Sequence, residues 1–176
     1  LSLFKARAGW LVILFLGGIA TAAALRHYEE VTLELAWLVV FLPLIISSGG
    51  NTGSQAASLV IRGIAIKEMA LADWYKVLSR ELVVCLLLGI LLGVMGFVQS
   101  QIWGLSFVVG GIVATSLLGI VLFGGLCGAM LPFLFQRVNL DPAVSSSPLL
   151  ASLVDLFGVL IFYNLAVVVT RIFLGA

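Results

Sequence analysis

Charge is scarce in this chain. Lys, Arg, Asp and Glu make up 10% of its 176 residues, whereas ordinary soluble domains carry roughly a quarter. Nine basic and eight acidic residues leave a net charge of +1, so the basic surface that a nucleic-acid-binding protein needs is missing. Cysteine occurs only at Cys85 and Cys127, far apart in two apolar runs. This placement predicts buried free thiols and argues against a disulfide framework.

Histidine and buried acids are too few for several kinds of catalytic site. The only histidine, His27, lies at a predicted helix end, so neither a zinc or copper cluster nor a buried Ser–His pair is expected. An intramembrane aspartyl protease needs two acids, and only Asp155 lies well inside an apolar run. We therefore predict that the protein is not an enzyme.

Apolar residues dominate what remains. They form 62% of the sequence, and the mean hydropathy is +1.27. A helix needs roughly 20 apolar residues to cross the hydrocarbon core, and we expect five such helices at about 10–27, 33–62, 74–98, 105–135 and 143–173. Short loops and the lack of Ser- or Pro-rich linkers favour a single transmembrane domain over residues 1–176. The sequence thus predicts an all-α polytopic membrane protein.

The basic residues predict the orientation of these helices. With the N-terminus inside, only Arg26 and Arg171 lie outside, and seven cations lie on the cytoplasmic side: Lys5, Arg7, Arg62, Lys67, Lys76, Arg80 and Arg137. Because Lys and Arg accumulate in cytoplasmic loops, we predict an N-inside, C-outside topology. The chain begins without Met or a signal pattern, so we expect it to be part of a longer protein.

The second predicted span contains a polar segment, "LPLIISSGGNTGSQ", at residues 42–55. Pro43 lacks an amide and leaves one carbonyl without its helical partner. Gly49, Gly50 and Gly53 leave the α region at little cost. Together these residues predict a broken membrane helix.

The fifth predicted span has a similar interruption. Ser145, Ser146, Ser147 and Pro148 stand at its start, and Asp155 follows Pro148 by seven residues, about two helical turns. An acid at this depth is costly, so it should face a bundle interior or an aqueous path; a structural hydrogen bond to a neighbouring helix is the alternative. Carbonyls freed by helix breaks commonly coordinate cations. One carboxylate with such oxygens is a hard ligand set that suits Mg²⁺ or Ca²⁺.

These two segments resemble one known family. "FLPLIISSGGNTGSQAASLVIRGIA" is similar to the second transmembrane helix of the MgtE family of magnesium channels. "NLDPAVSSSPLLASLVDLFGVLIFYNLA" is similar to its fifth helix, including the Asp-Pro-Ala start and the intramembrane aspartate. The resemblance covers essentially the whole chain, and the two motifs occur in the family's order.

The resemblance implies a homodimer in the lipid bilayer, with five helices per subunit and a central pore lined by the second and fifth helices. Asp155 matches the principal Mg²⁺ ligand of the pore, and carbonyl ligands would fall at Ser47, Gly50 and Ala151. Ser47 replaces the glycine expected there. The implied pore-lining and entrance residues are Pro43, Gly49, Asn51, Asp141, Ser147 and Pro148. Members of the family also carry N-terminal cytoplasmic regulatory domains, including a CBS pair, so the resemblance implies that these residues correspond to the pore domain of a longer protein.

The sequence therefore predicts a Mg²⁺-selective channel of the cell (inner) membrane that conducts hydrated Mg²⁺ into the cytoplasm, with Mn²⁺ or Ca²⁺ as other occupants of the site. A secondary transporter that exchanges a divalent cation against Na⁺ or H⁺ would use the same residues and stays an alternative. A purely structural subunit would leave both polar interruptions without an explanation.

Overall fold

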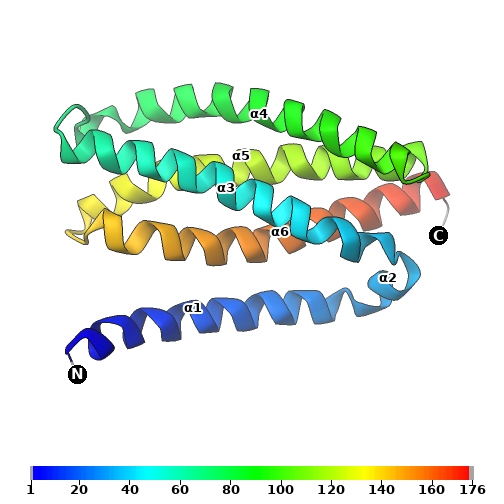
Figure 1. Ribbon diagram of the computed structural model, residues 1–176, viewed down its shortest axis with the longest axis horizontal. Coiled ribbons are helices and arrows are strands. Elements are labelled where there is room, and N and C mark those ends of the chain that lie inside the picture. The colour runs from blue at the N-terminus through cyan, green and yellow to red at the C-terminus, as the bar shows by residue number, and fades with distance from the viewer. Residues whose placement is uncertain (1, 175–176) are drawn as a thin grey trace.

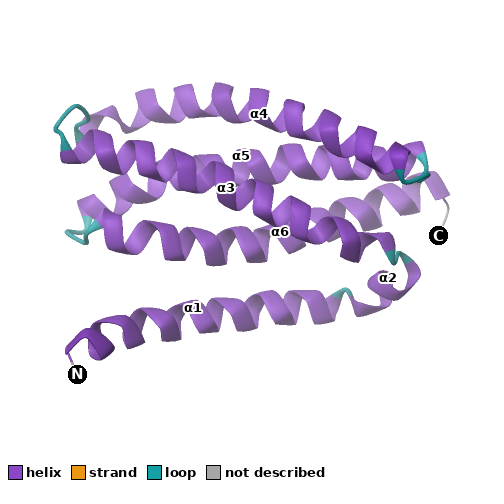
Figure 2. Ribbon diagram, viewed as in Figure 1, coloured by secondary structure: helices purple, strands orange, loops and turns teal. Residues whose placement is uncertain are grey.

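The computed structural model describes residues 2–174, which form helices joined by short loops (Figures 1 and 2). The side chains of residues 2, 3, 5–7, 143–145, 147, 173 and 174 lie outside the described part. In chain order the elements are α1 (Ser2–His27), α2 (Glu29–Glu34), α3 (Trp37–Ala65), the 3₁₀ helix η1 (Leu71–Asp73), α4 (Trp74–Ile102), α5 (Phe107–Arg137) and α6 (Pro142–Leu174). Strands are absent from this described range, which confirms the predicted all-α class.

Helix α5 is the centre of the bundle. It packs against α3, α4 and α6, and its buried residues include Leu117 and Ile120. Phe41 of α3 and Phe162 of α6 are also fully buried, and they belong to the same apolar core. Helix α1 lies at the edge of the molecule beside α6 (Figure 1). No residue in the most apolar window of α1 is fully buried, so the side of this helix that faces away from α6 is available to lipid.

Four segments of the described chain are long and apolar enough to cross a membrane: Ala8–His27, Leu71–Ile102, Phe107–Arg137 and Pro148–Ile172. They correspond to four of the five predicted spans. Helix α3, the remaining one, has 29 residues and packs along α5 and α6. Because its polar segment lowers its hydropathy, α3 is not among these four segments. The count of five spans therefore stays a prediction.

The predicted breaks in the second and fifth helices are wrong. Helix α3 continues through Pro43 and α6 continues through Pro148. A proline removes one backbone hydrogen bond, and the turns on either side hold the helix together. Gly104 is the only glycine with a positive φ, 74°, among the described residues, so the glycines of α3 stay in the helical region.

The glycines of α3 instead allow a close crossing with α5. A Cβ atom added to Gly53 would lie 2.5 Å from the carbonyl oxygen of Gly124, and one added to Gly128 would collide with the backbone of Gly53. Gly49 and Gly124 approach each other in the same way. Gly124 and Gly128 therefore have a packing role, because only small residues let two helix backbones come so near.

An aromatic cluster fixes the junction of α1 and α2 to α6. The rings of Tyr28 and Tyr163 stack with centroids 4.9 Å apart. The Tyr163 hydroxyl is hydrogen-bonded to the Thr32 hydroxyl (3.0 Å), and Asn164 Nδ2 donates to the Tyr28 hydroxyl (2.8 Å). These contacts give the lone edge helix a defined attachment to the bundle.

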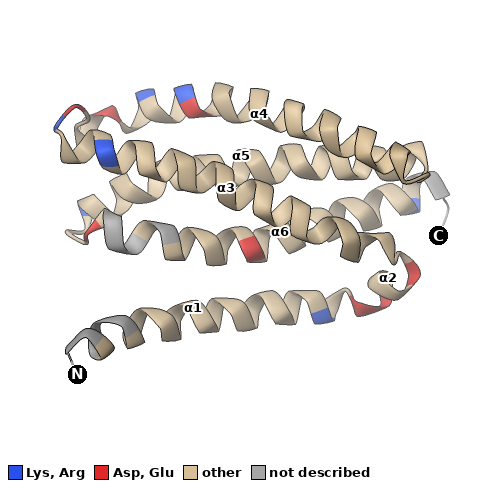
Figure 3. Ribbon diagram, viewed as in Figure 1, with Lys and Arg blue, Asp and Glu red and all other residues tan. Residues whose placement is uncertain are grey.

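Charged residues gather at the two ends of the bundle (Figure 3). The end with the α3–α4 and α5–α6 loops holds Arg62, Lys67, Lys76, Arg80 and Arg137, and the other end holds Arg26 and Arg171. Lys5 and Arg7, which the predicted topology also places inside, have side chains outside the described part. The structure thus separates the cations as the topology requires, and the assignment of one end to the cytoplasm stays a prediction.

The close crossing predicts different effects for two neighbouring glycines. Gly53→Ala should lower the free energy of unfolding by about 1–3 kcal/mol, because its methyl group meets the backbone of α5. Gly50→Ala is the matched control: its Cβ would meet nothing within 4 Å, and the gain in helix propensity should raise stability by up to about 1 kcal/mol. Thermal unfolding in one detergent would compare them. Equal effects of the two variants would contradict the proposed crossing.

Candidate functional site

Helices α3 and α6 run antiparallel, and their contacts fix which residues lie at the same level. A Cβ atom added to Gly158 would lie 3.1 Å from Ile46 Cγ1, and one added to Gly49 would lie 3.1 Å from Val154 Cγ1. One turn further along α3, a Cβ on Gly53 would lie 2.9 Å from Leu150 Cδ2. Asp155, next to Val154 in the chain, therefore lies at the level of Gly49 in α3.

Asp155 projects from the exposed side of α6. Ala151, one turn earlier, is also exposed, and Val154 between them is buried. The side chain of Asp155 makes no hydrogen bond or ion pair within the described part of the chain. A structural hydrogen bond to a neighbouring helix was the alternative role, and the described residues of the protomer offer no partner for it.

Helix α3 carries a row of polar side chains on its exposed face. Ser47, Asn51, Ser54 and Ser58, here called the polar stripe, recur every three or four residues and are all exposed. Such spacing puts them on one face of a helix. The opposite face holds the glycines that contact α5. The polar segment therefore has two faces: the small residues pack against α5, and the hydrogen-bonding residues of the stripe are exposed.

Hydrogen bonds within the polar stripe leave oxygen atoms toward the outside. Asn51 Nδ2 donates to Ser47 Oγ (3.3 Å), and the Ser58 hydroxyl donates to the carbonyl of Ser54 (2.8 Å). A hydroxyl that donates to its own helix keeps its lone pairs as acceptors, as does the amide oxygen of Asn51. The stripe therefore offers acceptors, which suit the water shell of a cation.

A hollow lies beside the part of the polar stripe that is nearer the α3–α4 loop. Its volume is about 710 Å³, and it is lined by Asn51, Ser54, Gln55, Ser58, Leu59 and Arg62. It opens on the same exposed face of α3 and extends to the charged end of the bundle. In a single protomer this hollow is open to one side.

The structure brings together part of the predicted site. Ser47, Gly50, Asn51, Ala151 and Asp155 occur at similar levels of two packed helices, and each is exposed or half-buried. The carbonyls of Ser47, Gly50 and Ala151 belong to continuous helices, so each already accepts one helical hydrogen bond.

The other predicted residues are more scattered. Pro43 is exposed one turn before Ser47, whereas Gly49 is buried against α5 and α6. Asp141 precedes α6 at the charged end, and Pro148 is half-buried. The side chain of Ser147 lies outside the described part.

Glu81 is a buried acid that the sequence analysis did not single out. Glu81 lies on α4 and is only 6% exposed. Arg80 Nη2 lies 3.2 Å from its carboxylate oxygen Oε1. The residue directly precedes the apolar run that begins at Leu82. The helical spacing in the sequence could have indicated this position. Val77 and Cys85, four residues to either side, are apolar and buried, so Glu81 lies on the buried face of α4.

Comparisons with known proteins agree on one family. Residues 42–165 match the model of the MgtE family, described as a divalent cation transporter. The chain is 41% identical over 165 residues to the magnesium transporter MgtE of Thermus thermophilus, which covers 94% of this chain and 36% of that protein. It is 29% identical over 160 residues to the protein of the same name from Bacillus subtilis, covering 91% of this chain and 36% of that protein. The corresponding Enterococcus faecalis protein is 29% identical over 167 residues, with coverages of 95% and 37%. The chain thus spans little more than a third of the length of these curated relatives.

The polar stripe predicts where water reaches the bundle. In a background with Cys85 and Cys127 replaced by alanine, Ser54→Cys should react with a charged, water-soluble thiol reagent at least about tenfold faster than Val94→Cys. Val94 is 58% exposed on α4 but stands on an apolar face, where lipid excludes both the reagent and the reactive thiolate. Labelling rates in proteoliposomes provide the measurement. Equal rates would show that the stripe faces lipid.

Proposed function

Because the chain belongs to the MgtE family of divalent cation transporters, we propose that it forms the membrane-spanning, Mg²⁺-conducting part of a magnesium transporter. One observation carries the proposal: the exposed carboxylate of Asp155 lies at the level of the polar segment of α3 and has no partner among the described residues of its own protomer. A charge in hydrocarbon costs at least about 2.5–3.5 kcal/mol. Its exposed position is therefore best explained by an aqueous path.

A second copy of the chain would complete that path. An exposed carboxylate and a row of hydroxyls would be unfavourable against lipid tails, whereas a twofold axis beside α3 and α6 would turn the stripes and carboxylates of two protomers toward each other. Homodimers of this symmetry are the commonest oligomers. In this arrangement α3 also crosses the membrane, which brings the number of spans to five, and its polar face is directed to the pore.

The pair of Asp155 carboxylates would hold Mg²⁺ through its water shell. Mg²⁺ loses water reluctantly and usually retains several water molecules when bound. Those waters donate hydrogen bonds, and the acceptors available at this level are the carboxylates, the oxygens of the polar stripe and the second lone pairs of the carbonyls at Ser47, Gly50 and Ala151. Continuous helices can thus serve an ion that keeps its water, without the freed carbonyls that direct coordination requires.

The membrane potential favours inward movement of cations. With the charged loop end in the cytoplasm, the orientation follows the positive-inside rule, and the membrane in question is the cell (inner) membrane. The membrane potential contributes about 2.3 kcal/mol per elementary charge per 100 mV, and Mg²⁺ carries two. Down such a gradient a channel needs no second energy source.

Coupled exchange against H⁺ or Na⁺ is the second candidate. The observation that favours it is the buried carboxylate of Glu81, because coupling transporters use ionisable groups inside the membrane as proton or ion relays. Arg80 already pairs with this carboxylate at 3.2 Å, which occupies it in the present conformation. The channel therefore accounts for the structure with fewer assumptions.

Replacing the proposed ligand tests the site. Asp155→Asn should lower Mg²⁺ flux into proteoliposomes more than about tenfold, because two neutral amides no longer attract a divalent cation, whereas the size of the side chain is kept. Asp73→Asn is the control, since Asp73 pairs with Lys76 at 2.9 Å near the start of α4 and should leave flux unchanged. A fluorescent Mg²⁺ indicator reports the flux. Wild-type flux in Asp155→Asn would remove this residue from the site.

The mode of transport requires a separate measurement. For a channel, Mg²⁺ influx should follow the imposed membrane potential and persist when pH and Na⁺ are equal on both sides. Flux would be recorded in vesicles with a potassium diffusion potential of either sign. Loss of influx upon removal of the H⁺ or Na⁺ gradient would favour exchange over conduction.

A further inference from the structure

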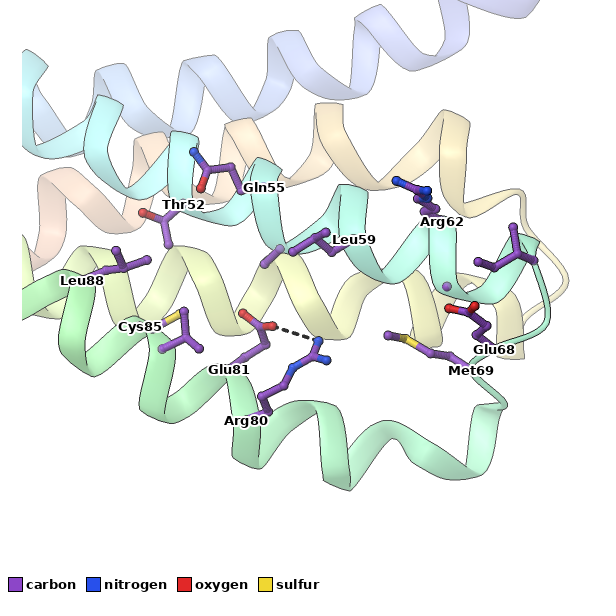
Figure 4. Close-up of a pocket in the computed structure, with 14 residues that line it drawn as sticks. Thr52, Gln55, Leu59, Arg62, Glu68, Met69, Arg80, Glu81, Cys85 and Leu88 are labelled. Atoms are coloured by element: carbon purple, nitrogen blue, oxygen red, sulfur yellow. Dashed lines mark hydrogen bonds and ion pairs between the residues drawn. The ribbon is translucent and has the colours of Figure 1, made fainter.

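A second cavity lies between α3 and α4, behind the polar stripe (Figure 4). Its volume is about 460 Å³. Helix α3 and the loop after it contribute Thr52, Gln55, Ala56, Leu59, Arg62, Gly63, Ile66, Glu68 and Met69, and α4 contributes Arg80, Glu81, Val84, Cys85 and Leu88. None of the residues that carry the proposed Mg²⁺ site lines it.

The walls of this cavity change character along its length. Arg62 and Glu68 lie at the end near the α3–α4 loop, and Arg80 lies deeper, beside Glu81 (Figure 4). Leu59, Val84 and Leu88 line the part that reaches toward the membrane interior. Thr52 and Arg62 are ten residues apart on α3, about 15 Å, which is about the depth of one leaflet of the hydrocarbon core. A charged mouth with apolar walls of this depth matches an amphipathic molecule.

Four charged side chains line the cavity, and two of them, Arg80 and Glu81, form an ion pair. Glu81 is almost completely buried, and its ion pair with Arg80 draws that guanidinium to the cavity (Figure 4). Arg62 and Glu68 form no ion pair within the part of the chain that the structure describes. The mouth therefore offers one unpaired cation and one unpaired anion, and its lining has no net charge.

We propose that this cavity binds a phospholipid with an ethanolamine headgroup. The phosphate would accept hydrogen bonds from Arg62, and the primary ammonium would donate to Glu68. One acyl chain would lie along Leu59, Val84 and Leu88. Pockets between membrane helices near basic loops can hold lipid headgroups. This cavity has one carboxylate to match its unpaired arginine, so it selects a headgroup that carries both a phosphate and a donor cation.

Other occupants match the lining less well. An anionic headgroup with no amine would leave Glu68 unpaired beside a negative charge. A choline headgroup carries the positive charge but has no N–H to donate. A hydrated divalent cation would meet two arginines, which repel it. The zwitterion with a primary amine is thus the ligand that pairs each charged group of the mouth.

Native mass spectrometry of the chain in a mild detergent tests this assignment. After removal of bound lipid, an equimolar mixture of phosphatidylethanolamine, phosphatidylglycerol and phosphatidylcholine with identical acyl chains is added. The wild-type chain should retain phosphatidylethanolamine about tenfold more than either other lipid. Arg62→Gln and Glu68→Gln should each reduce this retention about tenfold, the loss expected for one charge-assisted hydrogen bond.

Two controls keep the result specific. Lys67→Gln removes a cation of the same loop that does not line the cavity and should retain the lipid like the wild type. Asp155→Asn should also leave retention unchanged, so the outcome is independent of the proposed Mg²⁺ site. Circular dichroism confirms that each variant is folded.

Three results would overturn the proposal. The first is equal retention of all three lipids. The second is a preference for phosphatidylglycerol that Glu68→Gln leaves intact, which would indicate an anionic lipid. The third is binding of glycerophosphoethanolamine as tightly as the intact lipid, which would identify a free headgroup and not a membrane lipid as the occupant.

Discussion

The close crossing of α3 and α5 is the contact on which the arrangement of this bundle depends. Gly49 and Gly53 meet Gly124 and Gly128 with almost no space between the two backbones. Without a hydrophobic force between helices in lipid, close van der Waals packing of this kind is a main source of helix association. The crossing holds α3 by its small-residue face, so its hydrogen-bonding face is directed outward. The same contact sets the height of α3 against α6 and thereby places Asp155 beside the polar segment.

The two faces of α3 explain why a strongly polar sequence occurs in this membrane domain. Residues that pack and exposed residues that can form hydrogen bonds alternate with the period of one helix, so neither set disturbs the other. Asp155 adds the only charge at that level among the described residues. The proposed water-mediated binding of Mg²⁺ requires only acceptors at the right height, and two helices that remain regular through their prolines can provide them.

The sequence predicted most of the helices because long apolar runs have few alternatives in a membrane protein. It failed at the polar segment of α3 because glycine has two properties, conformational freedom and small size, and composition does not show which one is used. Gly124 and Gly128 have the same four-residue spacing on another helix, but the sequence does not show that they face Gly49 and Gly53. The level of Asp155 relative to α3 also depends on contacts between distant segments. Glu81 was overlooked because it stands at the edge of an apolar run, where acids are usually solvated. Helix α2 was overlooked because its six residues form too short a pattern.

The glycine crossing has a consequence for how the domain is assembled. The glycines of α3 have their partners on α5, and α4 lies between these two helices in the chain. The crossing can therefore form only after α4 has been synthesised. Until then α3 lacks the contact that fixes its height and its rotation, so the direction of its hydrogen-bonding face is set late, together with the placement of α5.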